Sequence, residues 1–183
     1  GDNHNQVSPS QEELKIPSKE KYVYRQFKMS PDGRYAAFAT NEAGQYKIWL
    51  YDISKNELKR IAKGEQKLNR LNDYSFPVLG WHPTGIGLAF IAEKKGEINF
   101  CMYSLSDEKT TVKPLSKLDK VLSFDYSDDG KTLIFSGVSQ GQTDLFYYRP
   151  LGNSIEQITN DFYDDMYPKF VHNSTAVIFA SNR

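Results

Sequence analysis

One short stretch of sequence recurs along the chain, and this repeat constrains the fold more than any other feature. It occupies residues 30–38, 82–90 and 127–135, and it returns in degenerate form at 171–179. Each copy ends in a phenylalanine, and successive phenylalanines are 52, 45 and 44 residues apart. Self-similarity at a fixed period of roughly 20–50 residues is typical of proteins built from repeated copies of one structural unit.

Each copy predicts a turn followed by a buried strand. Pro31-Asp32-Gly33 and Asp128-Asp129-Gly130 favour a turn, because proline fixes φ and glycine accepts a positive φ. The short apolar run after each turn has the length and character of a strand. A third strand, rich in aromatic and β-branched residues, is expected at 46–53, 97–105 and 144–149. A fourth, more polar strand is expected at 57–62, 111–115 and 155–159, and its polarity favours an outer edge position.

Four short strands at this period predict an all-β fold of the β-propeller class. Residues 20–183 would supply about three and a half four-stranded blades, so the chain is expected to be a fragment of a larger propeller. The expected units are a disordered tail (1–11), an orphan outer strand (12–17), and blades at 20–63, 73–117, 120–160 and, in part, 162–183.

The composition argues against several classes of function. Lys and Arg number 23 and Asp and Glu number 23, so the net charge is zero, which disfavours a basic nucleic-acid face or a polybasic membrane-surface module. No apolar run is long enough to cross a bilayer, so no transmembrane segment is expected. Cys101 is the single cysteine, which excludes an internal disulfide and a cysteine-based zinc site. We expect no metal and no cofactor.

Three segments of the repeat resemble a known family. Residues 30–39, 141–148 and 178–183 are similar to TolB-type β-propeller repeats, also called WD-like repeats. The second copy has Thr84 in place of the turn aspartate, and the fourth has lost the Pro, Asp and Gly together. The resemblance implies a bacterial periplasmic or cell-envelope location and a protein partner. It also implies an alternative, because related propellers are the N-terminal gating domains of prolyl-oligopeptidase-like serine peptidases.

The best functional candidates lie in the connections between blades, which border one mouth of the channel in a propeller. These connections combine aromatic side chains with mixed charge, as protein-contact surfaces tend to do. The candidate partner-binding residues are Asp161, Tyr163, Asp164, Asp165, Tyr167, Asp73, Tyr74, Tyr22 and Tyr24.

Other chemically suggestive residues have structural explanations. Asp125, Asp128 and Asp129 are expected to accept backbone N–H groups in a turn. His82 and His172 are interpreted as exposed turn residues, and Trp49 and Trp81 as core residues. The string Gly137-Val138-Ser139-Gln140-Gly141 formally matches a nucleophile elbow, but it lies between two predicted strands with no helix after it. No catalytic residue is therefore predicted.

The sequence favours a non-catalytic binding or scaffolding propeller that engages a protein partner through its inter-blade loops. The alternative is the gating propeller of a larger peptidase, whose catalytic residues would lie in another part of the protein. A carbohydrate-active propeller is a weaker third reading, which would need a carboxylate pair facing the channel. Self-association through exposed blade edges is also expected.

Overall fold

The structure is a computed structural model that describes residues 23–42, 44–65, 77–159, 168–172 and 176–178. The described residues form β-strands, turns and loops, with strands in three four-stranded sheets and one two-stranded sheet. The first sheet, blade 1, contains β1 (Val23–Met29), β2 (Tyr35–Glu42), β3 (Gln45–Asp52) and β4 (Glu57–Lys63). Blade 2 contains β5 (Leu79–Trp81), β6 (Gly87–Lys94), β7 (Glu97–Ser104) and β8 (Thr110–Pro114).

Blade 3 contains β9 (Lys120–Tyr126), β10 (Leu133–Ser139), β11 (Gln142–Arg149) and β12 (Ser154–Gln157). The two-stranded sheet contains β13 (Lys169–Phe170) and β14 (Val177–Ile178) and represents the described part of blade 4. The expected third and fourth strands of blades 1 to 3 agree with these bounds to within two residues.

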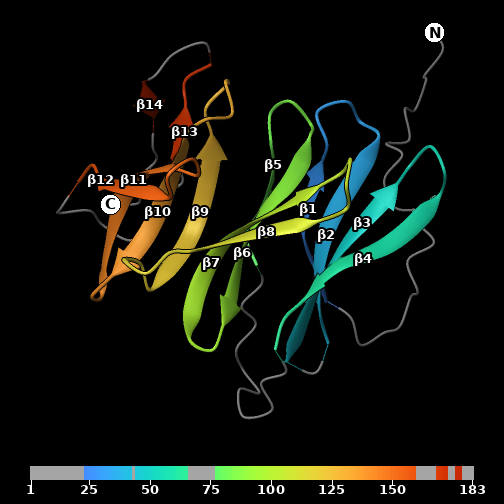
Figure 1. Ribbon diagram of the computed structural model, residues 1–183, viewed down its shortest axis with the longest axis horizontal. Helices are drawn as coiled ribbons and strands as arrows, with labels where there is room; N and C mark the ends of the chain where they lie inside the picture. The colour runs from blue at the N-terminus through green and yellow to red at the C-terminus, as the bar shows by residue number, and fades with distance from the viewer. Residues whose placement is uncertain (1–22, 43, 66–76, 160–167, 173–175, 179–183) are drawn as a thin grey trace, which may run out of the picture.

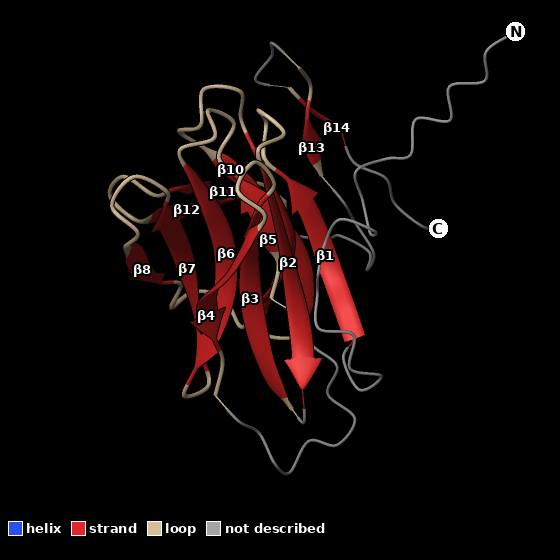
Figure 2. Cartoon of the chain, turned by 90° about the vertical axis from the view of Figure 1, so that its right-hand side faces the viewer, coloured by secondary structure: helices blue, strands red, loops and turns tan. Residues whose placement is uncertain are grey.

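Each four-stranded sheet is an antiparallel meander in which neighbours in sequence are neighbours in the sheet. The three sheets stand face to face like the vanes of a fan (Figure 1), and Figure 2 shows blade 1 in front, running from β4 to β1. This arrangement is the β-propeller architecture that the repeat predicts. The described residues contain no helix that could span a bilayer.

The second strand of blades 2 and 3 is a continuous apolar run because a neighbouring sheet covers each of its faces. In β6, Leu88 and Phe90 pack toward blade 1, whereas Ala89 and Ile91 pack toward blade 3. In β10, Phe135 packs toward blade 2 and Ile134 toward blade 4. Alternate side chains of a strand point to opposite faces, so a doubly covered strand cannot alternate apolar with polar residues.

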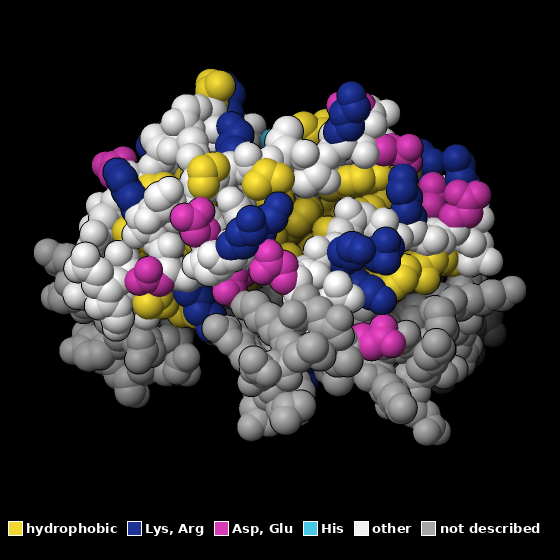
Figure 3. Space-filling model, turned by 60° about the horizontal axis from the view of Figure 1, so that its bottom comes forward, with side chains coloured by type: hydrophobic (Ala, Val, Ile, Leu, Met, Phe, Trp, Pro, Cys, Tyr) yellow, Lys and Arg dark blue, Asp and Glu magenta, His cyan; other side chains and the backbone are white. Residues whose placement is uncertain are grey.

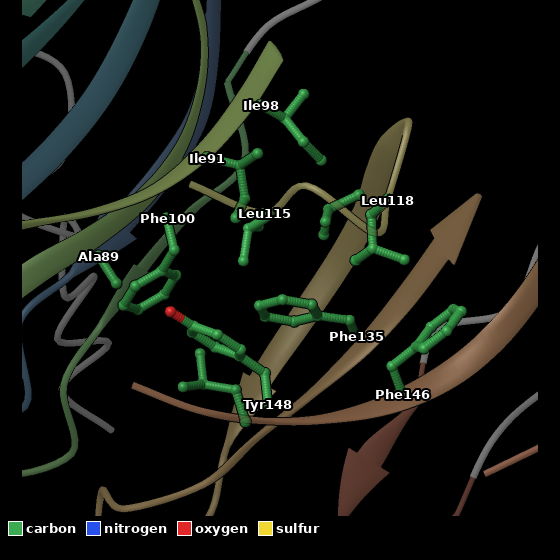
Figure 4. Packing of buried hydrophobic residues seen from close by; sticks show 11 residues of the cluster. Ala89, Ile91, Ile98, Phe100, Leu115, Leu118, Phe135, Phe146 and Tyr148 are labelled. Carbon is green, nitrogen blue, oxygen red and sulfur yellow. The ribbon is translucent and has the colours of Figure 1, made fainter. Parts of the chain in front are cut away.

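The seam between blades 2 and 3 holds an aromatic cluster. Phe100, Phe135 and Tyr148 converge there, with ring centroids 5.0 Å apart for Phe100–Tyr148 and 4.9 Å apart for Phe135–Tyr148 (Figure 4). Leu115 and Leu118, from the connection between the two blades, are buried against the same cluster. The connection therefore seals the seam as well as joining the strands.

The prediction that both tryptophans are core residues is only partly correct. Trp49 and Trp81 are both half-buried. The indole N–H of Trp49 donates to Thr40 Oγ1 at 2.9 Å, within blade 1. The indole of Trp81 packs against the cluster between blades 1 and 2 and lies 6.2 Å from the Tyr35 ring. Polar contacts at the N–H keep both rings at the margin of the core.

Candidate functional site

The repeated turns gather at one end of the blades, the upper end in Figure 1. Each turn joins the innermost strand of a blade to its second strand. Consecutive turns approach closely: a Cβ added to Gly85 would lie 3.8 Å from Pro31 Cδ, and one added to Gly130 would lie 2.2 Å from His82 Nε2. This turn end is the part of the described chain where polar and titratable groups of different blades meet.

Blades 1 and 3 build the turn in the same way. The hydroxyl of Ser30 donates to Asp32 Oδ1 at 2.7 Å, and the same oxygen accepts the Arg34 backbone N–H at 3.0 Å. In blade 3, Ser127 donates to Asp129 Oδ1 at 2.7 Å, and Lys131 N–H donates to it at 3.0 Å. A carboxylate that accepts such bonds is stabilised in its charged form.

These hydrogen bonds lower the pKa of both aspartates. The pKa of Asp32 is lowered, chiefly by the Arg34 backbone N–H and then by the Ser30 hydroxyl. The pKa of Asp129 is lowered, chiefly by the Ser127 hydroxyl and then by the Lys131 backbone N–H. Both carboxylates are therefore charged turn residues at neutral pH.

Blade 2 replaces this pair with His82 and Thr84. The backbone N–H of Thr84 donates to His82 Nδ1 at 3.3 Å, and Thr84 Oγ1 lies 2.7 Å from the same nitrogen. The histidine stands where the other two turns have serine, and it accepts the backbone N–H of Thr84, which stands where they have aspartate. Burial is the main cause that lowers the pKa of His82, and a hydrogen bond with the Gly130 backbone opposes it.

Each seam is bridged by a contact at or beside the turns. Between blades 1 and 2, Trp81 Nε1–H donates to the Lys28 carbonyl at 2.8 Å. Between blades 2 and 3, His82 meets Gly130 and packs edge-on against Tyr126, with ring centroids 5.2 Å apart. Between blades 3 and 4, Asp125 Oδ2 accepts the Phe170 N–H at 2.8 Å.

Further contacts tie the outer strands together. Lys59 Nζ lies 2.5 Å from Glu108 Oε1, between blades 1 and 2, and this bond is the main cause that raises the pKa of Lys59. Between blades 2 and 3, Asn153 Nδ2 donates to the Pro114 carbonyl at 2.9 Å. Exposed ion pairs contribute little to stability individually. Together, however, the contacts beside the turns and the contacts between outer strands fix the relative orientation of the blades.

Replacing Trp81 by Phe should lower the free energy of unfolding by about 1 kcal/mol, because the Lys28 carbonyl loses its donor while the ring packing is retained. Urea unfolding followed by circular dichroism measures the change. Trp49→Phe is the matched variant, since its indole bond stays within blade 1. An unchanged midpoint for Trp81→Phe would show that this bond does not stabilise the fold.

The structure corrects two sequence interpretations at this end, those of His82 and Asp125. His82 is not an exposed turn histidine, because it is half-buried and contacts the next blade. Of the three aspartates, Asp129 accepts a backbone N–H within its own turn. Asp125 instead accepts a backbone N–H from blade 4. Asp128 Oδ1 lies 3.3 Å from His172 Nδ1, a contact that leaves its predicted turn role open. Sequence reasoning missed these contacts between blades. One usable signal was that His82 stands where the first and third repeats have a serine.

The grouping of the predicted partner-binding residues stays a prediction, because almost all of them lie outside the described residues. Only Tyr24 falls within them, where its backbone pairs with Thr40 in the β1–β2 ladder. The other candidates lie outside the described residues: Asp161, Tyr163, Asp164, Asp165, Tyr167, Asp73, Tyr74 and Tyr22.

Other candidate chemistry has a structural explanation. Gly137–Gly141 covers the end of β10 and its hairpin turn to β11. Cys101 is buried, and burial raises the pKa of its thiol to about 11, which keeps it protonated at neutral pH. Within the described ranges, no three His, Cys, Asp or Glu side chains converge as a metal site would require.

The surface seen in Figure 3 carries charges of both signs around adjoining hydrophobic side chains. On the face seen in Figure 3, basic and acidic side chains alternate, with hydrophobic side chains exposed between them. At the turn end, Met29 is 52% exposed and Ile86 is 57% exposed.

Four-stranded meanders packed face to face and joined at their turns place the chain among the β-propeller proteins. No family model and no curated protein sequence matches it. Solved structures do match. TolB from Acinetobacter baumannii aligns over 86% of this chain and 37% of its own, with 18% identity and a TM-score of 0.66.

Two further matching structures are named as an enzyme or as a domain of one. Oligogalacturonate lyase from Vibrio parahaemolyticus aligns over 90% of this chain and 48% of its own, with 12% identity and a TM-score of 0.66. The β-propeller domain of the trilobed protease from Pyrococcus furiosus aligns over 80% and 45%, with 13% identity and a TM-score of 0.58. The chain thus spans less than half the length of each of these three proteins. At these identities the likeness establishes the β-propeller fold.

Proposed function

We propose that this chain is part of a non-catalytic binding or scaffolding propeller of the bacterial cell envelope, which engages a protein partner through its loops. The supporting observation is that the polar residues of the repeated turns make structural contacts. Ser30, Asp32, Ser127 and Asp129 are engaged in turn hydrogen bonds, and His82 joins two blades. Hydrogen bonds that shape each turn, together with a histidine that contacts the next blade, make a rigid platform, and recognition then falls to the loops.

The envelope location and the protein partner rest on the TolB resemblance of the repeats and on the similarity to the TolB structure. The contact residues proposed are the acidic and aromatic ones of the inter-blade connections, led by Asp164 and Asp165. Carboxylates beside tyrosines suit a partner surface that presents basic and apolar groups.

Site-directed photo-crosslinking of the native protein in its source cells tests this proposal. A benzoyl-phenylalanine at Tyr163 should yield one discrete adduct in the envelope fraction, and Asp164→Ala with Asp165→Ala should remove it. The matched control is the same probe at Val112 on the outer strand β8, which is 60% exposed and should yield no such adduct. No adduct at Tyr163, or the same adduct at both positions, would overturn the proposal.

A second candidate is the gating propeller of a larger serine peptidase. The similarity to the propeller domain of the trilobed protease favours it. Intact mass and reading frame of the native protein separate the two. A catalytic segment with a serine on a strand-to-helix turn would establish the peptidase, whereas further blades without one would exclude it.

A further inference from the structure

Two serine side chains face blade 4 from neighbouring strands of blade 3. Ser123 of β9 and Ser136 of β10 are paired across the antiparallel ladder, so their side chains lie on one face of the sheet. The same face carries Ile134, which packs toward blade 4, and Asp125, which accepts the Phe170 N–H of that blade. The two hydroxyls therefore lie side by side in the seam between blades 3 and 4.

Both hydroxyls are buried, and neither has a hydrogen-bond partner among the described residues. The Oγ atoms of Ser123 and Ser136 are closed off from solvent, and Ser136 is buried as a whole residue. Leu145 is paired with Ser136 on its other side and is also buried, so blade 3 offers only apolar side chains there. A buried hydroxyl without a partner is costly, which calls for a polar group between the two blades.

The other blades show that this position does not have to be polar. Counted from the phenylalanine that ends each copy of the repeat, Ile91 stands where blade 3 has Ser136. Its N–H donates to the Val78 carbonyl at 3.0 Å, and both side chains pack in the cluster between blades 2 and 3. In blade 1, the same position is Ala39, which is buried toward blade 2. Serine is smaller than valine and isoleucine, so the pair in blade 3 leaves more room in its seam.

We propose that Ser123 and Ser136 form a binding site for one internal water molecule, held between blades 3 and 4. The inference goes beyond the proposed binding function and does not depend on it. A water oxygen can accept from both hydroxyls at the same time, and buried waters make about three hydrogen bonds to buried polar groups. Asp125, two residues along the same face of β9, carries a carboxylate that can accept from the water.

The chemistry of the site favours a neutral molecule over a cation. The Asp125 carboxylate is already compensated, because Oδ2 accepts the Phe170 N–H at 2.8 Å and Oδ1 lies 3.7 Å from Lys169 Nζ. No three His, Cys, Asp or Glu side chains of the described segments converge there. A direct hydrogen bond between the two serines would leave one hydroxyl hydrogen without an acceptor, whereas a water between them serves both.

Alanine at Ser136 tests the site by the sign of its effect on stability. If a water joins the two hydroxyls, Ser136→Ala should raise the unfolding equilibrium constant several-fold in urea titrations, because Ser123 and the water both lose a bond. If the hydroxyl has no partner, the same substitution removes a desolvation penalty and should lower that constant. Ser154→Ala on the outer strand β12 is the matched control, because that side chain is exposed. An unchanged or lowered constant for Ser136→Ala would overturn the site.

The double variant tests whether one molecule serves both serines. Once Ser136→Ala has released the water, Ser123→Ala should cost little more, so the double variant should show less than the product of the two single fold-changes. Fold-changes that simply multiply would show two independent hydroxyls and overturn the shared site.

A high-resolution crystal structure of the unmodified chain provides a test that needs no variant. The expected result is one ordered water at about 2.8 Å from both Ser123 Oγ and Ser136 Oγ, which disappears in the double alanine variant. A protein side chain bonded to both hydroxyls, a direct bond between the two serines, or no density between them would overturn the proposal.

Discussion

Alanine at Gly130 is expected to lower the free energy of unfolding by about 3 kcal/mol. Gly130 has φ +70°, in the left-handed region that costs a residue with a Cβ about 1–2 kcal/mol. The added methyl would also lie 2.2 Å from His82 Nε2, far inside van der Waals contact. Thr84 and Tyr126 hold the ring, so it cannot move aside freely, and overpacking typically costs about 1–3 kcal/mol.

The repeat provides the control for this measurement. Gly33 occupies the same turn position in blade 1 with φ +72°, and no atom lies within 4 Å of an added Cβ. Gly33→Ala should therefore cost only the backbone strain, about 1–2 kcal/mol. Urea unfolding of both variants isolates the contact with His82 as the difference between them. Equal losses would show that the approach of the two turns is unimportant for stability.

The blade meander was predictable because its determinants are local. Pro31-Asp32-Gly33 specifies a turn whatever surrounds it, and the described structure has the Ser30–Asp32 bond and the positive φ at Gly33 that such a turn requires. The apolar runs of β6 and β10 likewise follow from burial on both faces. Each of these features lies within about ten residues of sequence, where patterns are informative.

The contacts between turns were not predictable in the same way. His82 and Gly130, or Asp125 and Phe170, meet only because the blades are stacked, and no pattern within either segment announces the partner. Asp125 looks like a turn cap in sequence, yet it accepts the Phe170 backbone N–H of blade 4. Candidate partner-binding residues such as Asp164 share this difficulty, since their grouping depends on several blades at once.

Truncating Phe135 to alanine is expected to destabilise the protein at least as much as alanine at Gly130. The side chain is fully buried, and its ring centroid lies 4.9 Å from Tyr148, 6.3 Å from Phe124 and 6.4 Å from Phe100. Removing a buried phenylalanine costs about 3–5 kcal/mol, from lost transfer free energy and from the cavity left behind. Phe100 belongs to blade 2 and the other two rings to blade 3, so the cavity would open in the seam.

Phe27→Ala is the matched control, because Phe27 is 47% exposed and stacks on Phe38 within blade 1. Its loss should be about 1 kcal/mol, since half of the ring is already in water. The slope of the urea transition carries the further information. A loss of stability at constant slope for Phe135→Ala means that the blades unfold together, through the seam that Phe135 fills. A shallower slope or two separate transitions would mean that each blade is stable alone, and that the aromatic cluster between blades 2 and 3 does not couple them.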